Sequence, residues 1–270
     1  MSNITDSTNF RNKQYIDSRN LAARAALHER FSINPIGWQP WVYQQLQLER
    51  AARILEIGCG PGYLWQKNTQ NLSQKWQIFL GDLSQGMLEE ARASLGGMSC
   101  FKYTILDGAY LPFPESFFDG VIANHVLHHL PDVSDTLQEV LRVLQPGGLF
   151  YAATNGEKHL QEIRQWKDTY LPGSDQVEWG TPVDLFNLSN GSAILGRFFN
   201  PVHLHLYSDH LQVTEIEPII NYIQSYQGST DSSLGIDRLR IDLEKKLSEH
   251  GSISISKETG LFAAQKPIQP

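Results

Sequence analysis

The chain has 270 residues, 41% of them hydrophobic and 19% charged, with a formal net charge of −7 and a pI near 5.7. Such a chain can bury one substantial core with a small appended lid. The acidic balance, without any Lys/Arg run, argues against nucleic acid or an anionic membrane surface as the main partner. Two cysteines, a polar N-terminus and no apolar stretch near the roughly 20 residues that span a bilayer predict a cytoplasmic protein without disulfides or a membrane span.

The first 50 residues are expected to be helical and to precede the sheet. Apolar residues recur at helical spacing over 20–31, and after a break that contains Pro and Gly a second helix can run over 41–48. Trp38 and Trp41 give this segment an aromatic surface, which favours a lid beside a binding cleft. The alternative is a plain cover over the sheet. We take residues 1–50 as an N-terminal helical lid segment.

Residues 54–62, Ile-Leu-Glu-Ile-Gly-Cys-Gly-Pro-Gly, are the stretch around which the chain is organised. A short buried strand is predicted over 53–57, and the glycines that follow make a turn with no side chain to block a ligand. A helix is predicted over 63–72, with its N-terminus facing that turn. Strand, glycine turn and helix form the first unit of a nucleotide-binding α/β domain. Tyr63 stands where a dinucleotide fingerprint has its last glycine, which disfavours a dinucleotide.

Three acidic residues fall where successive predicted strands end. Glu56 lies near the end of the first strand, Asp82 ends a second strand over 77–82, and Asp107 follows a third over 101–106. In a doubly wound sheet, ligands bind outside the carboxyl ends of the strands. A cluster of carboxylates there suits a cationic ligand with free hydroxyls and no phosphate.

Four motifs resemble, in order and spacing, those of class I S-adenosylmethionine-dependent methyltransferases of the small-molecule type 11 and type 25 kind. They are Glu56-Ile-Gly-Cys-Gly-Pro-Gly62, Gly81-Asp82-Leu-Ser, Asp107-Gly-Ala and Phe118-Asp-Gly-Val-Ile-Ala-Asn-His-Val-Leu-His-His-Leu-Pro-Asp132. The match covers roughly residues 50–156. The resemblance implies S-adenosyl-L-methionine as cofactor and S-adenosyl-L-homocysteine as product.

The resemblance also implies a role for each motif. In that family the glycine turn lies under the methionine part of the cofactor, and the acid after the second strand holds both ribose hydroxyls. The acid after the third strand reads the adenine amino group, and the residue that ends the fourth strand lies by the sulfonium. Carried over, the cofactor-binding residues are Glu56, Gly58, Cys59, Gly60, Gly62, Asp82, Leu83, Asp107, Gly108, Ala109 and Asn124. Cys59 is expected to be a small residue that the turn tolerates, and not a reactive thiol.

The fold class expected is α/β, a Rossmann-like, doubly wound, seven-stranded and mostly parallel sheet with an insertion after the fifth strand. The resemblance implies the strand order 3-2-1-4-5-7-6, with the last strand antiparallel. One domain is expected overall, with a cofactor-binding core over 51–156, a cap insertion over 157–200 and a C-terminal part over 201–270 that completes the sheet. Further helices are expected over 84–95, 135–144, 157–170, 190–199, 214–226 and 235–249, and further strands over 118–123, 149–154, 202–207 and 261–266.

His125 follows the predicted end of the fourth strand, so its side chain can turn toward the transferred methyl group. A histidine near its free pKa can take the proton of an O–H or N–H nucleophile. The alternative is that His125 only frames the pocket, because methyl transfer can run mainly on proximity. His128 and His129 are expected to be packing or capping residues. His203 and His205 share one strand face, but two ligands without a third are weak evidence, and no metal is expected.

The function expected is methyl transfer to an O or N atom of a small, apolar or aromatic organic molecule, such as a natural-product intermediate of secondary metabolism. The protein is expected to be a monomer or homodimer that binds neither nucleic acid nor membrane. Aromatic segments before and after the core are expected to form the acceptor pocket. Its candidate residues are Trp38, Trp41, Glu157, Trp166 and Phe186.

Two other functions remain open at this point. An NAD(P)-dependent oxidoreductase is disfavoured by Tyr63 and by Glu56, which would set a carboxylate near the phosphates. A non-catalytic cofactor-binding or scaffold protein would be expected to have lost Asp82 or the glycines, and it has lost neither. The run at 124–127 lacks the Asn/Asp-Pro-Pro-aromatic pattern of enzymes that methylate DNA bases or glutamine side chains, so those substrates lose support.

Overall fold

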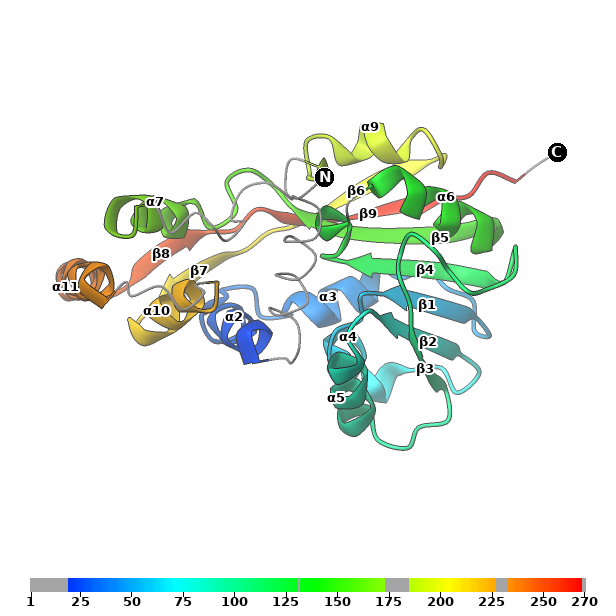
Figure 1. Ribbon diagram of the computed structural model, residues 1–270, viewed down its shortest axis with the longest axis horizontal. Helices are drawn as coiled ribbons and strands as arrows, with labels where there is room; N and C mark the ends of the chain where they lie inside the picture. Colours follow the sequence, from blue (N-terminus) through cyan, green and yellow to red (C-terminus); the bar gives the residue numbers. More distant parts are fainter. Residues whose placement is uncertain (1–18, 131, 173–184, 227–232, 269–270) are drawn as a thin grey trace, which may run out of the picture. The chain divides into compact units, whose positions relative to one another are not determined.

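The computed structural model describes residues 19–130, 132–172, 185–226 and 233–268 (Figure 1). These residues form two compact units, each with its own core. The sheet unit consists of residues 38–130, 132–156, 185–207 and 259–268, and the helical unit consists of residues 19–37, 157–172, 208–226 and 233–258. The predicted segments 1–50, 157–200 and 201–270 are therefore each divided between the two units.

A seven-stranded sheet forms the centre of the sheet unit. Its strands, in sequence order, are β1 (Arg53–Ile57), β2 (Gln77–Asp82), β3 (Phe101–Ile105), β4 (Phe118–Asn124), β5 (Leu144–Asn155), β6 (Val202–Tyr207) and β9 (Thr259–Gln265). They lie in the order β3-β2-β1-β4-β5-β9-β6, with β9 antiparallel to both of its neighbours and the neighbouring pairs among β1 to β5 parallel (Figure 1). The predicted order is confirmed, with β9 as the seventh strand of this sheet.

The helices of the sheet unit are short. They are α3 (Trp38–Gln45), α4 (Tyr63–Gln66), α5 (Gln85–Leu95), α6 (Val133–Val143) and α9 (Gly191–Leu195), with 3₁₀ turns at η1 (Thr69–Asn71) and η2 (Leu127–His129). Ser84 caps α5 by accepting a hydrogen bond from the Met87 N–H, and Asp132 caps α6 by accepting one from the Ser134 N–H.

The helix predicted over 63–72 is wrong beyond its first turn. It ends at Gln66, and the side-chain amide of Asn68 donates a 2.6 Å hydrogen bond to the Leu64 carbonyl. A side chain that satisfies the backbone in this way competes with helix continuation.

Both faces of the sheet are buried, which explains the nearly continuous apolar runs in its central strands. On one face Leu55, Val121 and Phe150 are fully buried in a core that includes α6 and α9. On the other face Ile54 and Ile122 are fully buried in a core that includes α3, α4 and α5. Alternate residues of one strand thus supply two cores, and the strand ends are left to carry polar side chains.

The helical unit contains helices α2 (Arg19–Phe31), α7 (Gln161–Tyr170), α10 (Glu217–Gln224) and α11 (Ser233–His250) and an antiparallel pair, β7 (His210–Val213) with β8 (Ile253–Ser256). These two strands were not predicted. The core of the unit draws one nearly fully buried residue from each of α2, α7, α10, α11 and β8, namely Leu27, Ile163, Ile220, Leu239 and Ile255. No helix among the described residues is long and apolar enough to cross a membrane.

A buried ion pair joins three segments of the helical unit. The Lys257 ammonium lies 2.5 Å from the Asp209 carboxylate, and the two side chains are 4% and 0% exposed. Asp209 also accepts hydrogen bonds from the Ser32 hydroxyl and from the backbone N–H groups of Ile33 and Asn34. Burial alone would raise the pKa of Asp209, but the bonds from Lys257 and Ser32 lower it below its ordinary value. The carboxylate thereby holds the end of α2 against the segments beside β7 and β8.

Candidate active site

The turn after β1 leaves its backbone uncovered. Gly58, Gly60 and Gly62 have φ angles of +66°, +53° and +82°, a region that favours glycine. A Cβ atom on Gly58 would also lie 2.6 Å from a methyl carbon of Val126. Position 58 therefore requires glycine for two reasons, and the turn presents main chain at the carboxyl end of β1.

Asp82, at the end of β2, contacts this turn directly. Its Oδ2 accepts a 2.9 Å hydrogen bond from the Gly60 N–H, and its Oδ1 accepts one of the same length from the Ser84 N–H. Burial raises the pKa of Asp82 above its ordinary value, and these hydrogen bonds oppose the rise. Leu83, the next residue, is 62% exposed. The glycine turn and the end of β2, which the sequence predicts at one sheet edge, are joined there by the hydrogen bond between Gly60 and Asp82.

Glu56 is buried beside the turn, with 2% of its surface exposed. The indole N–H of Trp65, a fully buried residue of α4, donates a 2.6 Å hydrogen bond to its Oε2. Burial raises the pKa of Glu56 to about 8, the Trp65 bond opposes the rise, and the charge of Asp82 adds to it. Glu56 is therefore mainly a neutral acid at pH 7 in the free protein.

Cys59 and the loop after β3 have mainly structural contacts. Cys59 is 6% exposed, and burial raises the pKa of its thiol well above the ordinary value, as expected for a packing residue. Asp107 is exposed and accepts a 2.9 Å hydrogen bond from the Ala109 N–H. A Cβ atom on Gly108 would lie 3.3 Å from Ile57. The loop at 107–109 is thus held close to the end of β1.

Asn124, the last residue of β4, is bonded on both sides of its carboxamide by α3. The Trp38 indole N–H donates to its Oδ1 at 3.2 Å, and its Nδ2 donates to the Gln39 Oε1 at 3.3 Å. The next residue, His125, has a φ of +57°, and its ring centroid lies 5.1 Å from that of Trp38. Part of the predicted lid therefore packs on the end of β4 within the sheet unit.

Four rings gather at this end of the sheet and are called the aromatic cluster: Trp38, Trp41, His125 and Tyr207. Trp38 stacks on Trp41 with ring centroids 5.2 Å apart, and Tyr207, at the end of β6, lies within 5.2 Å of both indoles. Sequence reasoning missed Tyr207 and Trp65. The signal for Tyr207 was available, because it ends a predicted strand as Asn124 does.

The remaining candidates lie elsewhere. Phe186 is fully buried in the core of the sheet unit, with its ring centroid 5.7 Å from that of Phe262. Glu157 is exposed and Trp166 packs against the core of the helical unit, so both belong to that unit. Burial lowers the pKa of His128 to about 4, which makes it a neutral packing residue.

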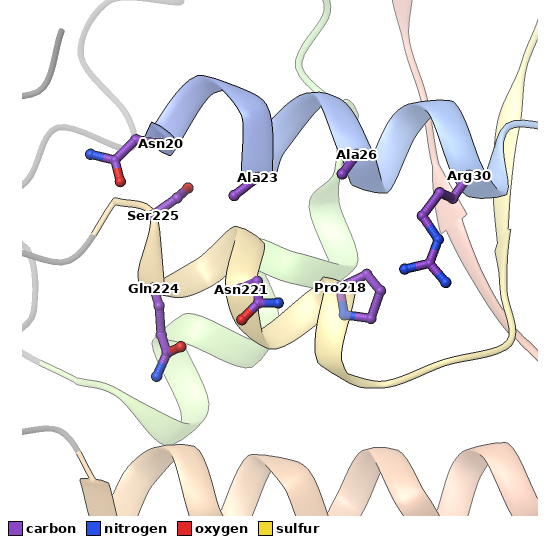
Figure 2. Close-up of a pocket in the computed structure, with 8 residues that line it drawn as sticks. All are labelled: Asn20, Ala23, Ala26, Arg30, Pro218, Asn221, Gln224 and Ser225. Atoms are coloured by element: carbon purple, nitrogen blue, oxygen red, sulfur yellow. The ribbon is translucent and has the colours of Figure 1, made fainter. Parts of the chain in front are cut away.

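A hollow of about 310 Å³ lies between α2 and α10 in the helical unit. Figure 2 shows Ala23 and Ala26 of α2 on one side and Asn221 and Gln224 of α10 on the other. None of the candidate residues lines this hollow.

S-adenosylmethionine carries a sulfonium and an ammonium group, and both need negative charge nearby. Glu56 and Asp82 form no ion pair with Lys, Arg or His in the described part of the chain, and the charge of Asp82 raises the pKa of Glu56. Two carboxyl groups without a cation, beside bare glycine backbone and the exposed Leu83, suit a ligand with positive charge and an apolar ring. The residues present fit the cofactor.

Comparisons with known proteins bear on the same residues. Residues 55–152 match the family model described as "Methyltransferase domain". The chain is 29% identical over 147 residues to a ubiquinone/menaquinone biosynthesis C-methyltransferase of Vibrio cholerae, which covers 53% of each chain. It is 34% identical over 174 residues to a malonyl-[acyl-carrier protein] O-methyltransferase of Legionella pneumophila. That alignment covers 63% of this chain and 60% of the relative. The chain thus spans little more than half the length of these relatives.

Solved structures agree at the level of the fold. The YcgJ protein from Bacillus subtilis superposes with a TM-score of 0.58 at 17% identity, covering 85% of this chain and 97% of that one. The glycine turn joined to Asp82 and strands β2, β3 and β4 all fall within the segment that the family model matches. Residues 55–152 therefore match a methyltransferase domain, in a sheet whose strand order is the one expected for class I S-adenosylmethionine-dependent methyltransferases.

Proposed function

We propose that the protein transfers the methyl group of S-adenosylmethionine to an O or N atom of a small, flat or apolar organic molecule. The observation that carries the proposal is the hydrogen bond from the Gly60 N–H to Asp82, which brings the glycine turn and the acid of β2 into one site. Asn124 ends β4 and Tyr207 ends β6 at the same sheet edge, and the rest of the aromatic cluster belongs to the same unit.

The residues at this edge have separate binding tasks in the proposal. A carboxylate has about four lone-pair sites, so Asp82 can accept bonds from ribose hydroxyls while it holds Gly60 and Ser84. Leu83 offers an exposed apolar surface for an adenine ring, and Asp107 stands at the end of β3 for its amino group. When bound, the cofactor supplies an electrophilic methyl group on its sulfonium.

The aromatic cluster supports the choice of acceptor. Stacked indoles offer a flat, apolar surface with few charges, which suits an aromatic or greasy molecule better than a phosphorylated one. The protein's task is to align the attacking atom about 3 Å from the methyl carbon and to exclude water. His125, which lies against Trp38, is the candidate to take the proton that an O–H or N–H acceptor loses.

Carbon is the second candidate for the acceptor atom. One relative is named a C-methyltransferase of ubiquinone and menaquinone biosynthesis, and a quinol ring is flat and apolar. Attack by a ring carbon also releases a proton, so His125 would keep the same task. The other relative is named an O-methyltransferase, which favours oxygen.

The test uses methyl-labelled S-adenosylmethionine with matched acceptors. One is a phenol with its reactive ring carbons blocked, another is a quinol with one ring carbon open, and the others are an aromatic amine and a malonyl thioester. Label on the phenol or amine is expected, and mass fragmentation would locate the new methyl group. If label is found on the ring carbon alone, the acceptor atom is carbon, and the proposal of an O or N acceptor is wrong. Binding of NAD(H) without any binding of S-adenosylmethionine or S-adenosylhomocysteine would refute methyl transfer to O or N and methyl transfer to carbon alike.

A further inference from the structure

Glu56 occupies an apolar slot in the centre of the sheet. Its neighbours in register are Leu80 on β2 and Ile122 on β4, and both are fully buried. On the side of α4, Trp65 donates its indole N–H to the Oε2 of Glu56 and is itself fully buried. The carboxyl group is therefore held in one orientation and is nearly, but not fully, covered, since 2% of Glu56 is exposed.

The charges around Glu56 are all acidic among the described residues. Asp82 raises its pKa, and Cys59, whose thiol pKa is raised in part by Glu56, is the other titratable neighbour. No lysine, arginine or histidine contributes to the pKa shift of Glu56. A second negative charge at this place is costly unless a cation arrives with it.

We propose that Trp65 is a positioning residue of the cofactor site, which holds the buried Glu56 carboxyl group in place while a ligand's ammonium group replaces its proton. This inference rests on the proposed function. The O–H bond of the Glu56 carboxyl breaks, the proton passes to water, and the carboxylate that remains faces the positive charge of the ligand. The charge in the buried slot is the same before and after the exchange, so the exchange avoids an isolated buried charge.

The exchange makes ligand affinity depend on pH in one direction. Below about pH 8 the free protein holds the proton, so binding must displace it. Affinity then rises with pH by at most about tenfold per unit and stops rising near pH 8, where the ammonium group of the ligand also begins to lose its proton. A site whose carboxylate is already ionised would show no such rise near neutral pH.

Calorimetry with S-adenosylhomocysteine at pH 7, in phosphate and in Tris, measures the protons released. Close to one proton per ligand is expected for the wild type and almost none for Glu56→Gln, whose affinity should be flat with pH. Glu89→Gln, an exposed position on α5, is the control and should match the wild type. 5′-Methylthioadenosine, which has no amino group, should bind without proton release.

Trp65→Phe keeps a buried ring but loses the N–H group. Since that hydrogen bond lowers the pKa of Glu56, its loss should move the rise in affinity to higher pH. Affinity should fall at pH 7 and return near the wild-type value at pH 9, which a merely structural defect would not produce. Equal proton release by the wild type and Glu56→Gln, or binding to the wild type without release, would overturn the inference and leave the proposed function standing. No binding at any pH would remove the proposed function itself.

Discussion

Position 58 shows how backbone conformation and packing act on one residue. Gly58 has a positive φ, and Val126 leaves no room for a Cβ atom. Gly96 has a similar φ of +63°, but nothing lies within 4 Å of the place where its Cβ would be. Substitution of Gly96 therefore measures backbone strain alone, whereas substitution of Gly58 measures backbone strain together with steric overlap.

Gly96→Ala should lower the free energy of unfolding by about 1 to 3 kcal/mol, because a φ of +63° with a ψ of −163° is a backbone region that glycine alone adopts readily. Gly58→Ala should cost about 1 to 3 kcal/mol more, since Val126 must also move. Urea unfolding of both variants measures the difference. Equal losses would mean that the turn relaxes away from Val126.

Asp82→Asn keeps an oxygen that can accept from Gly60 but removes the charge. Losing a charged hydrogen-bond partner should weaken S-adenosylmethionine binding by about 1.5 to 3 kcal/mol. Asp132→Asn, at the cap of α6, is the control and should leave the affinity unchanged. Calorimetry compares the variants, and wild-type affinity in Asp82→Asn would show that the cofactor site is misplaced.

His125→Asn tests the proton acceptor without straining the backbone, because asparagine tolerates a positive φ better than alanine. If His125 is the base, the methylation rate should fall about 100-fold while cofactor affinity stays within a few-fold. The rate is measured across pH with the acceptor identified by label transfer, and His129→Asn is the control. Near-full turnover at every pH would assign His125 to the pocket wall.

At the scale of elements, α2 brings a histidine into the interior of the helical unit. The ring of His28 stacks on His159 at 5.8 Å and meets the edge of Tyr222 at 6.0 Å. Burial and then the nearby Lys257 charge lower the pKa of His28 to about 3, and Asp209 opposes the shift. The folded unit therefore keeps His28 neutral where the unfolded chain would protonate it.

A depressed histidine pKa contributes stability that is complete above pH 6.5 and is lost as pH falls toward 3. Urea unfolding at pH 7 and pH 5 compares the wild type with His28→Phe, and acidification should destabilise the wild type more than the variant. Glu56 and His128, whose pKa values are also shifted, titrate in both proteins and cancel in the difference. His203→Gln, an exposed position on β6, is the control. Asp209 does not interfere, since its lowered pKa matters only below its ordinary value of 3.8. The same pH slope in His28→Phe and the wild type would contradict the assignment.

The whole molecule divides at residue 37, between α2 and α3. Leu27 of α2 is fully buried in the core of the helical unit, whereas Val42 of α3 is fully buried in the core of the sheet unit. The segment predicted as one lid therefore belongs to two cores.

Two deletions test that division. Removing residues 2–37 should weaken the helical unit but leave the affinity for S-adenosylhomocysteine close to that of the full chain. Removing residues 2–45 also takes Val42, whose burial contributes about 1.5 to 3 kcal/mol, and the Trp38 bond to Asn124. That variant should bind weakly and should not methylate. Calorimetry and thermal unfolding compare the two, and equal affinities would contradict the role of α3.

The sequence by itself determined the parallel strands, their order by resemblance and the residues at their carboxyl ends, because buried strands and glycine turns leave local patterns. Only the tertiary structure decided that β7 and β8 pair in a separate unit, that α4 stops at Gln66, and that α3 reaches Asn124. It also placed Trp65 on Glu56 and Tyr207 beside Trp38. The physical reason is that these contacts depend on which side chains fill the space between elements far apart in the chain, and no local periodicity records that packing.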